Sequence, residues 1–240
     1  MATQRGMATQ SSSPPVVVTK GLGKRFGTRW ALAHLDLEIE GGQALLVAGS
    51  NGSGKTTLLK LIAGLYRPTA GSLTVRGLDP VGDRLQNRRA LSMVGHHSCL
   101  YERLSALESL RFWARALGRP SADSELIELL GEVGLAERRN SPVSTYSAGM
   151  RKRLALARSR LEDPSILLLD EPFAALDVAG QRQVEAWVER GRKSGMTIVL
   201  ASHQLEQAAA VCDRAIVLEH GQIAWMGDAR NLPSAFERAS

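Results

Sequence analysis

The sequence predicts an α/β fold with a mostly parallel core sheet and helices on its faces. The final third alternates apolar strand-like runs with helical patterns, which is typical of parallel sheets. The opening third is rich in strand-like segments, and residues from about 98 to 160 are helical in pattern. A helical insertion between two strand-containing parts is therefore expected. In the final third, strands are expected at 166–170, 197–200 and 215–218, and helices at 178–193 and 204–211.

Short strands and a loop are expected in the opening third. Residues 16–19 form an apolar run, and residues 35–39 alternate apolar and acidic side chains, which indicates a half-buried strand. Residues 72–75 predict another short strand between two glycines. Residues 21–27 contain three glycines and are expected to form a loop.

Three helices are expected in the middle of the chain. Ser105 and Glu108 have the spacing of a capping box, in which each side chain bonds the other residue's backbone N–H. The helix that they begin is expected to end at Gly118. A second helix is expected at about 124–133, and a third begins near Ser147.

Residues 49–57 carry the strongest chemical signal, because they fit the pattern G-x-x-x-x-G-K-[ST] between an apolar strand and a helix. In such a loop, backbone N–H groups and the helix N-terminus bind phosphate oxygens. Lys55 is expected to reach the outer phosphates, and the Thr56 hydroxyl to ligate Mg²⁺. The chain is thus predicted to bind a nucleoside triphosphate through Gly49, Ser50, Asn51, Gly52, Ser53, Gly54, Lys55, Thr56 and Thr57.

Acidic residues follow a buried strand at Asp170 and Glu171. The carboxyl ends of parallel strands share one edge of a sheet, so both residues are expected near the phosphate loop. Asp170 is predicted to hold Mg²⁺ with Thr56. Glu171 is predicted to orient or deprotonate the attacking water.

His203 and Ser147 each allow two interpretations. His203 follows the strand at 197–200, where a lone histidine is more often a turn residue, but the same edge suits a contact to γ-phosphate, water or Glu171. Ser147, followed by Ala148 and Gly149, is most simply a helix N-cap. A helix start with small side chains can also form a second phosphate-facing surface.

The composition is that of an ordinary globular protein, with 44% apolar and 22% charged residues among 240. The net charge of +6 could favour nucleic acid or an anionic membrane. The arginines are dispersed, however, and no compact basic run stands beside aromatics, so scattered surface charge without nucleic-acid binding is expected.

The compartment is predicted from three further features. Cys99 and Cys212 lie far apart and fit no metal pattern, so isolated thiols in a reducing compartment are expected. No apolar run reaches 18 residues. Residues 1–15 are polar and lack the apolar core of a signal peptide, so a disordered leader and a cytoplasmic protein are expected.

The order of these motifs resembles the ATP-binding cassette of ABC transporters, over about residues 16 to 228. The resemblance implies the fold of a P-loop NTPase cassette, with an antiparallel β subdomain and a helical subdomain at about 98–160 beside the core sheet. It implies one domain over 16–230, followed by a tail at 231–240. It also implies ATP hydrolysis, with Glu171, His203 and Lys55 in the catalytic site and ATP and Mg²⁺ as cofactors.

The resemblance assigns roles to further residues. Residues 146–150 correspond to the signature, usually LSGGQ, which contacts the γ-phosphate of ATP on the opposite subunit. This chain has Tyr146, Ala148 and Met150 where Leu, Gly and Gln are usual, and it keeps the serine and the second glycine. Three other positions resemble the D-loop aspartate, the adenine-stacking aromatic and the glutamine of the Q-loop: Asp177, Phe26 (with Trp30 as the alternative) and His97. His97 is expected to contact ATP or Mg²⁺, or to have no nucleotide contact.

Partners also follow from the resemblance. A second cassette, giving a homodimer, and integral membrane subunits are expected, with the chain peripheral on the inner face of the plasma membrane. Residues 95–118 resemble the haem exporter ATP-binding subunit of cytochrome c maturation. The alternative is an ABC-2 type drug, lipid or polysaccharide exporter, which shares the form of residues 146–150. A soluble ABC ATPase acting on DNA or ribosomes fits less well, because heptads and a second cassette are absent from this sequence.

Overall fold

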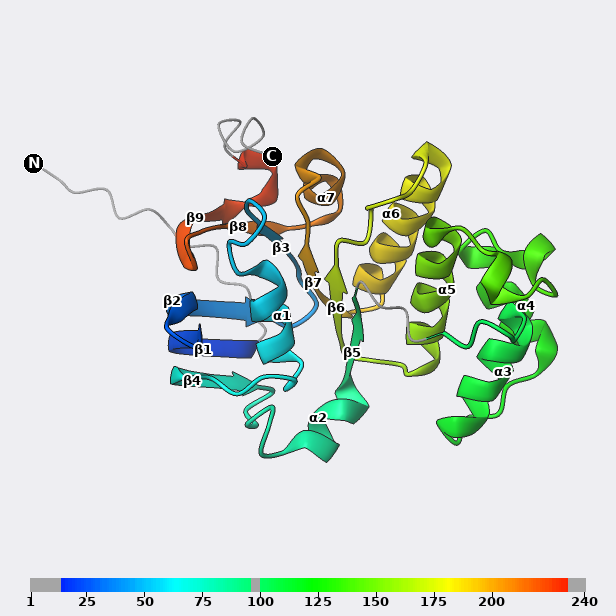
Figure 1. The fold of residues 1–240 in the computed structure, drawn as a ribbon, viewed down its shortest axis with the longest axis horizontal. Helices are drawn as coiled ribbons and strands as arrows, with labels where there is room; N and C mark the ends of the chain where they lie inside the picture. Colours follow the sequence, from blue (N-terminus) through cyan, green and yellow to red (C-terminus); the bar gives the residue numbers. More distant parts are fainter. Residues whose placement is uncertain (1–13, 96–99, 233–240) are drawn as a thin grey trace, which may run out of the picture.

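Two sheets carry the fold in the computed structural model, which describes residues 14–95 and 100–232 (Figure 1). The larger sheet has the strand order β5-β6-β7-β3-β8-β9. Its strands are parallel except β9, which pairs antiparallel with β8. The predicted mostly parallel core sheet is therefore confirmed. Its strands are β3 (Ala44–Ala48), β5 (Leu91–Val94), β6 (Ile166–Asp170), β7 (Thr197–Ala201), β8 (Arg214–Glu219) and β9 (Gln222–Asp228).

The smaller sheet is antiparallel, with the order β2-β1-β4, as the resemblance implied. It consists of β1 (Pro15–Phe26), β2 (Arg29–Glu40) and β4 (Ala70–Val75). Its β2 buries Leu35, Leu37 and Ile39 and exposes Asp36 and Glu38, so the predicted period-2 strand is present. Helix α1 (Lys55–Ile62) packs its apolar side chains into a core shared with both sheets.

The prediction of a loop at 21–27 is wrong, because β1 continues through most of this segment. The strand absorbs its glycines through register irregularities, one of which lies between Thr19 and Leu22. Gly21 takes a left-handed φ of 56°, and its N–H donates to the Asp36 carboxylate at 2.6 Å. The short helix α2 (Arg84–Ala90) and the edge strand β9 were also not predicted.

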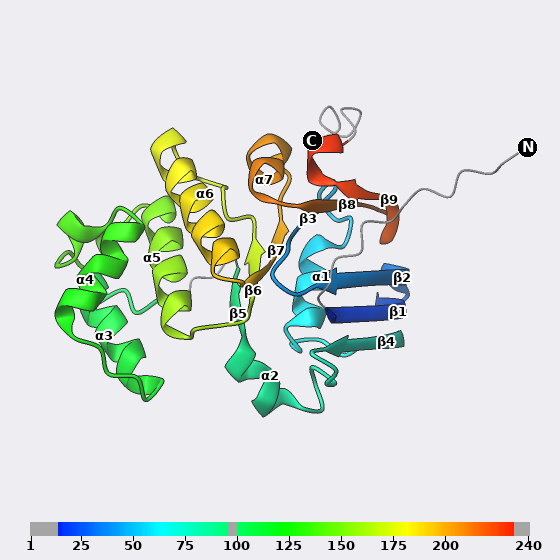
Figure 2. The ribbon, with the colours of Figure 1, turned by 180° about the vertical axis from the view of Figure 1, so that it is seen from behind.

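The helical insertion is present as expected and contains α3 (Ala106–Ala116), α4 (Asp123–Glu132) and α5 (Ala148–Leu161). Helices α3 and α4 lie at the end of the molecule farthest from the antiparallel sheet, and α5 lies beside α6 (Val178–Lys193) near the central sheet (Figures 1 and 2). Helix α7 (Leu205–Val211) completes the fold. The described residues also include 3₁₀ turns at Ala136–Arg138, Val143–Thr145 and Ala229–Asn231.

Side-chain caps define the starts of two helices in this insertion, α3 and α5. Ser105 accepts a hydrogen bond from the Glu108 backbone, and Glu108 accepts one from the Ser105 backbone, so the predicted capping box is present. Ser147 caps α5 by accepting from the Met150 N–H at 3.2 Å. The starts of α3 and α5 are therefore fixed by short-range hydrogen bonds, whereas α4 follows Ala122 without a side-chain cap.

The two sheets and the phosphate loop meet at one backbone carbonyl, that of Ala31 in β2. A Cβ added to Gly54 of the loop would lie 2.6 Å from this oxygen, and a Cβ added to Gly221 would also lie 2.6 Å from it. The Ala33 N–H donates to the Gly221 carbonyl at 2.9 Å. Two glycines thus allow β2 to approach both the loop and the β8–β9 turn.

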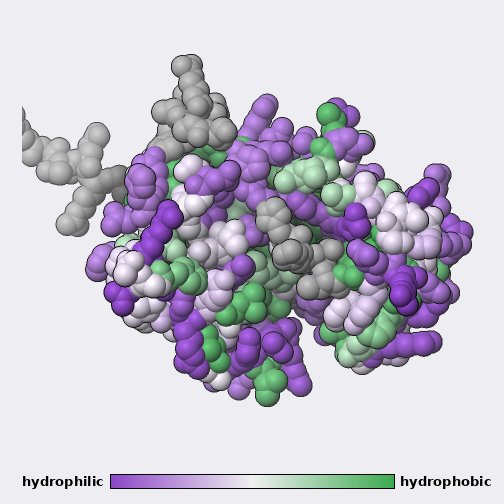
Figure 3. Space-filling view, in the orientation of Figure 1, coloured by the Kyte–Doolittle hydropathy of each residue, from purple (hydrophilic) through white to green (hydrophobic). Residues whose placement is uncertain are grey.

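The surface mixes hydrophilic and hydrophobic side chains. Figure 3 shows a face on which hydrophobic side chains form small separate patches among hydrophilic ones. Within residues 14–95 and 100–232, none of the helices has the length and apolar character needed to cross a bilayer. Cys212 is a buried free thiol, as expected, whereas Cys99 lies outside the described residues.

Candidate functional site

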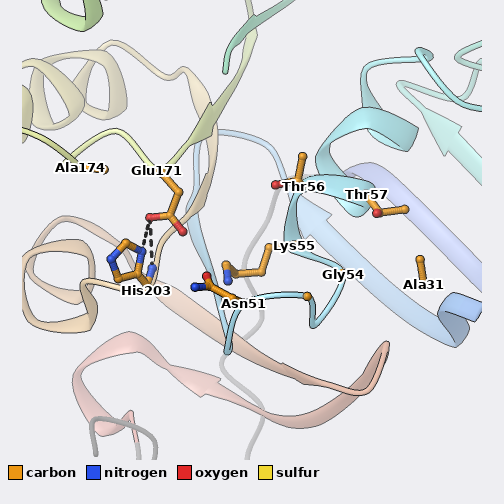
Figure 4. A pocket seen from close by; sticks show the side chains of 10 residues that line it. Ala31, Asn51, Gly54, Lys55, Thr56, Thr57, Glu171, Ala174 and His203 are labelled. Atoms are coloured by element: carbon orange, nitrogen blue, oxygen red, sulfur yellow. Dashed lines mark hydrogen bonds and ion pairs between the residues drawn. The ribbon is translucent and has the colours of Figure 1, made fainter. Parts of the chain in front are cut away.

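The phosphate loop, Asp170, Glu171 and His203 all lie at the carboxyl edge of the central sheet. The loop follows β3, the two acids end β6 or follow it, and His203 follows β7. The order β6-β7-β3 makes these strands neighbours. Their ends surround a cleft of about 400 Å³ (Figure 4). The cleft is lined by Ala31, Asn51, Gly52, Gly54, Lys55, Thr56, Thr57, Glu171, Ala174 and His203.

Lys55 is held inside the phosphate loop. Its Nζ donates to the carbonyl oxygens of Gly49 at 2.7 Å and Ser50 at 3.0 Å. Burial lowers the pKa of Lys55, and the carboxylates of Glu171 and Asp170 partly oppose this effect. Helix α1 begins at Lys55, and its N-cap residue Gly54 provides no side-chain cap. The loop thus offers a cation and a helix N-terminus without a side-chain cap to an anion.

Thr56 and Asp170 are 114 residues apart in the sequence and are hydrogen-bonded in the structure. The Thr56 Oγ1 donates toward the Asp170 carboxylate, with distances of 3.0 and 2.9 Å to its two oxygens. Asp170 is only 3% exposed. A hydroxyl and a carboxylate are hard oxygen donors, and their convergence at the loop fits the ligands that Mg²⁺ takes beside phosphates.

Glu171 and His203 form a second pair on the other side of the cleft (Figure 4). The His203 Nδ1 lies 2.8 Å from the Glu171 Oε2, and the His203 backbone N–H donates to the same oxygen at 3.3 Å. Glu171 has a φ of 53°, which is unusual for a residue with a side chain. Both contacts hold one carboxylate oxygen and leave Oε1 without a contact to His203.

The residues of the signature and D-loop lie elsewhere. Ser147 and Ala148 are exposed, and neither they nor Gly149 line the cleft. Asp177 caps α6 by accepting from the Gly180 N–H at 2.8 Å. Within one chain, the simple N-cap interpretation of Ser147 therefore accounts for its contact, and a phosphate contact would require a second molecule.

The expected adenine platform also lies outside the cleft lining. Phe26 is 46% exposed, and its ring meets Tyr66 edge-on at 5.4 Å between centroids. Trp30 is 43% exposed, and the Arg25 guanidinium lies 5.5 Å from its ring. The contact of Tyr66 with Phe26 was not predicted from the sequence. His97 lies outside the described residues.

Lys152 is a further residue at the site that sequence reasoning missed. Its Nζ donates to the backbone carbonyls of Glu171 and Ala174. In the sequence it stands between two arginines, which is typical of an exposed helix face. Only the folded chain brings this part of α5 to the turn after β6. Ala31, which lines the cleft, likewise carries no recognisable sequence signal.

Comparison with known proteins identifies the family. The family model described as "ABC transporter" matches residues 32–174. The chain is 32% identical to the ABC transporter ATP-binding protein NatA of Bacillus subtilis, over 84% of this chain and 83% of that protein. It is 36% identical to the daunorubicin resistance protein DrrA3 of Streptomyces coeruleorubidus, covering 90% and 69% of the two chains. The aliphatic sulfonates import protein SsuB of Pseudomonas putida is also 36% identical, over 86% and 74%.

Solved structures have the same fold. The cbiO1 subunit of Clostridium perfringens, part of the transporter complex cbiONQ, gives a TM-score of 0.80 at 23% identity, covering 94% of this chain and 93% of its own. An ATP-binding subunit of an ABC transporter gives 0.79 at 26%, covering 94% and 95%. A dimeric post-hydrolysis ATP-binding cassette bound to ADP and Pi gives 0.76 at 23%, covering 90% and 100%. This chain belongs to the ABC transporter family and is the ATP-binding, ATP-hydrolysing subunit of such a transporter.

Proposed function

We propose that two copies of this chain close on two ATP molecules, and that hydrolysis powers export through separate membrane subunits. Each site would take its phosphate loop from one copy and residues 147–149 from the other. The observation that carries the proposal is the composition of the cleft. It contains the phosphate loop, Glu171 and His203, whereas Ser147 is exposed and outside it.

Residues of the cleft have distinct roles in this proposal. Backbone N–H groups of residues 49–57 bind phosphate oxygens, and Lys55 turns from its two carbonyl partners to the outer phosphates. Thr56 and Asp170 would hold Mg²⁺, which neutralises phosphate charge when bound. Glu171 would orient and deprotonate the attacking water, and His203 would hold the Glu171 carboxylate and face the γ-phosphate.

Further residues complete the proposed nucleotide contacts. Phe26, with Trp30 as the alternative, would stack on the adenine, since both rings are half exposed. His97 would take the place of the Q-loop glutamine. Asp177 would lie with residues 147–149 at the contact between the two copies, because the residues just before it pack against Gly149.

For the transported substrate, the first candidate is haem. It is supported by the resemblance of residues 95–118 to the haem exporter subunit. The second candidate is a drug, lipid or polysaccharide of ABC-2 type transporters, supported by the similarity to DrrA3. In either case the chain would lie on the cytoplasmic face of the plasma membrane, bound to its membrane subunits. SsuB, which is named for import, is equally similar, so direction needs a direct measurement.

A mixing experiment tests the shared site. Lys55→Ala removes the phosphate-loop cation, and Ser147→Arg blocks the exposed helix start. Each variant alone should hydrolyse ATP at a small fraction of the wild-type rate. In a mixed dimer one composite site keeps both intact halves, so an equal mixture should regain about a quarter of the wild-type rate. A mixture that stays as inactive as its components would contradict the two-copy site.

A transport experiment tests the substrate. The chain is co-expressed with the membrane proteins encoded beside its gene, and the complex is reconstituted in vesicles with the nucleotide site outside. Haem export predicts ATP-dependent haem accumulation inside the vesicles, with ATPase activity stimulated by haem and not by daunorubicin. Stimulation by daunorubicin alone would support the second candidate. ATP-driven loss of haem from preloaded vesicles, instead of accumulation, would contradict export.

A further inference from the structure

Lys152 connects α5 to the turn that carries Glu171. It lies in the second turn of α5, beyond the cap formed by Ser147. Its Nζ donates to the Glu171 carbonyl and, at 3.0 Å, to the Ala174 carbonyl. Both acceptors belong to the turn that follows β6. A charged donor to two carbonyls makes charge-assisted hydrogen bonds, which are roughly twice as strong as neutral ones.

The Lys152 ammonium lies where water competes only weakly for its hydrogen bonds to the two carbonyls. The residue is half-buried, and burial lowers the pKa of Lys152, while Glu171 and Asp170 oppose this shift. The two carboxylates therefore compensate part of the cost of burying the cation. A half-buried cation that loses its contacts costs free energy. The turn conformation that keeps both carbonyls in contact with Lys152 is therefore favoured.

The turn itself needs such support. Glu171 has a left-handed φ of 53° and Ala175 one of 63°, and neither is a glycine. Residues in this region cost of order 1 kcal/mol each and persist where surrounding contacts hold them. The Glu171 N–H donates to the Ala201 carbonyl at 2.8 Å, which fixes one side of the residue to β7. Its carbonyl, on the other side, is fixed by Lys152 and by the Ala174 N–H at 3.3 Å.

We propose that Lys152 is a positioning residue for ATP hydrolysis, which holds the main chain of Glu171 so that its carboxylate faces the cleft. The inference rests on the proposed role of Glu171. Lys152 does not line the cleft, so it would act only through this turn. Without the cation, the turn would relax toward negative φ and move the carboxylate away from the attacking water. A displacement of about 1 Å at a reacting group costs on the order of 100-fold in rate.

The test compares Lys152→Met, Lys152→Arg and Arg160→Met in the full-length chain. Methionine keeps most of the aliphatic stem and removes the cation, and arginine restores a charged donor. Arg160 is an exposed arginine on the same helix and serves as the control. For Lys152→Met, kcat should fall between about tenfold and 100-fold, with KM and the Kd for ATP within about twofold. Lys152→Arg should recover most of the rate, and Arg160→Met should match the wild type.

A double variant separates positioning from a general loss of structure. If Lys152 acts through the Glu171 carboxylate, adding Lys152→Met to Glu171→Gln should lower the remaining rate by less than about twofold. A full further loss in the double variant, or a normal kcat in Lys152→Met, would overturn the proposal. If Lys152→Met fails to fold, Lys152→Gln, which keeps an N–H donor without charge, should give an intermediate kcat. Normal hydrolysis by Glu171→Gln alone would instead contradict the role proposed for Glu171.

Discussion

The carboxyl edge of the central sheet and the start of α5 differ in how complete they are within one chain. At the sheet edge, Thr56 already meets Asp170 and Glu171 meets His203, although each pair comes from distant parts of the sequence. At the start of α5, Ser147 makes a local cap and is otherwise exposed. One region is therefore organised by the fold of a single chain. The other is a helix start suited to binding an anion, and it does not line the nucleotide cleft of its own chain.

The largest effect is expected from a substitution in the first region, the carboxyl edge of the sheet. Glu171→Gln keeps the shape of the side chain and removes its charge, so ATP hydrolysis should fall by at least about 100-fold. ATP binding should remain, and the variant should accumulate as an ATP-dependent dimer in size-exclusion chromatography. Glu206→Gln, an exposed glutamate on α7, provides the control and should change neither property. Normal turnover in Glu171→Gln would remove the catalytic assignment.

A somewhat smaller effect is expected from Lys55→Ala. Loss of a charge-assisted contact to phosphate costs about 1.5 to 3 kcal/mol, which corresponds to roughly a ten- to 100-fold weaker ATP affinity. Titration calorimetry measures this affinity directly. Lys60→Ala removes a lysine from the same helix whose Nζ lies 5.5 Å from the Tyr66 ring, and it should leave ATP affinity unchanged. Equal losses in both variants would point to a non-specific charge effect.

Ser147→Ala addresses the second region. Loss of the cap should cost about 1 kcal/mol of unfolding free energy. If Ser147 also contacts the other copy's nucleotide, ATPase activity should fall by roughly tenfold. Ser105→Ala removes the equivalent cap from α3 and should show the same stability loss with normal ATPase activity. Matching ATPase activities in the two variants would leave Ser147 as a cap only.

The smallest effect is expected beside the signature, at Tyr146. Its ring is buried, and its hydroxyl donates to the Arg138 carbonyl at 2.7 Å. Tyr146→Phe should lower the unfolding free energy by about 1 kcal/mol, measured by urea denaturation, with ATPase activity unchanged. Tyr101→Phe, on a half-exposed ring, should have little effect on either property. A large ATPase loss in Tyr146→Phe would mean that this residue does more than pack.

Much of the sheet edge could be predicted from the sequence because its signals are local. The phosphate-loop pattern and the acids after an apolar strand define two strand ends, and parallel strands bring their ends to one edge. The meeting of Thr56 and Asp170 follows from this rule. The capping box at Ser105 is equally local, since both bonds span three residues.

Other features depend on pairing between distant segments. Residues 21–27 contain glycines that favour a loop, and cross-strand pairing with β2 and β4 overrides that preference. Helix α2 has few apolar residues and no amphipathic period to reveal it. Lys152 is one cation in a basic run, and its carbonyl partners are 19 and 22 residues away. No pattern within α5 announces that contact.

The close approach of Gly54 and Gly221 to the Ala31 carbonyl has a consequence for tolerance to mutation. Ala31 forms a wall of the cleft, whereas Gly221 does not line it. A methyl group at position 221 would push that wall, because no space exists between the turn and β2. A library of random variants selected for nucleotide binding should therefore retain only glycine at residue 221. A hairpin turn outside the lining of the nucleotide cleft therefore restricts where the wall residue Ala31 can lie.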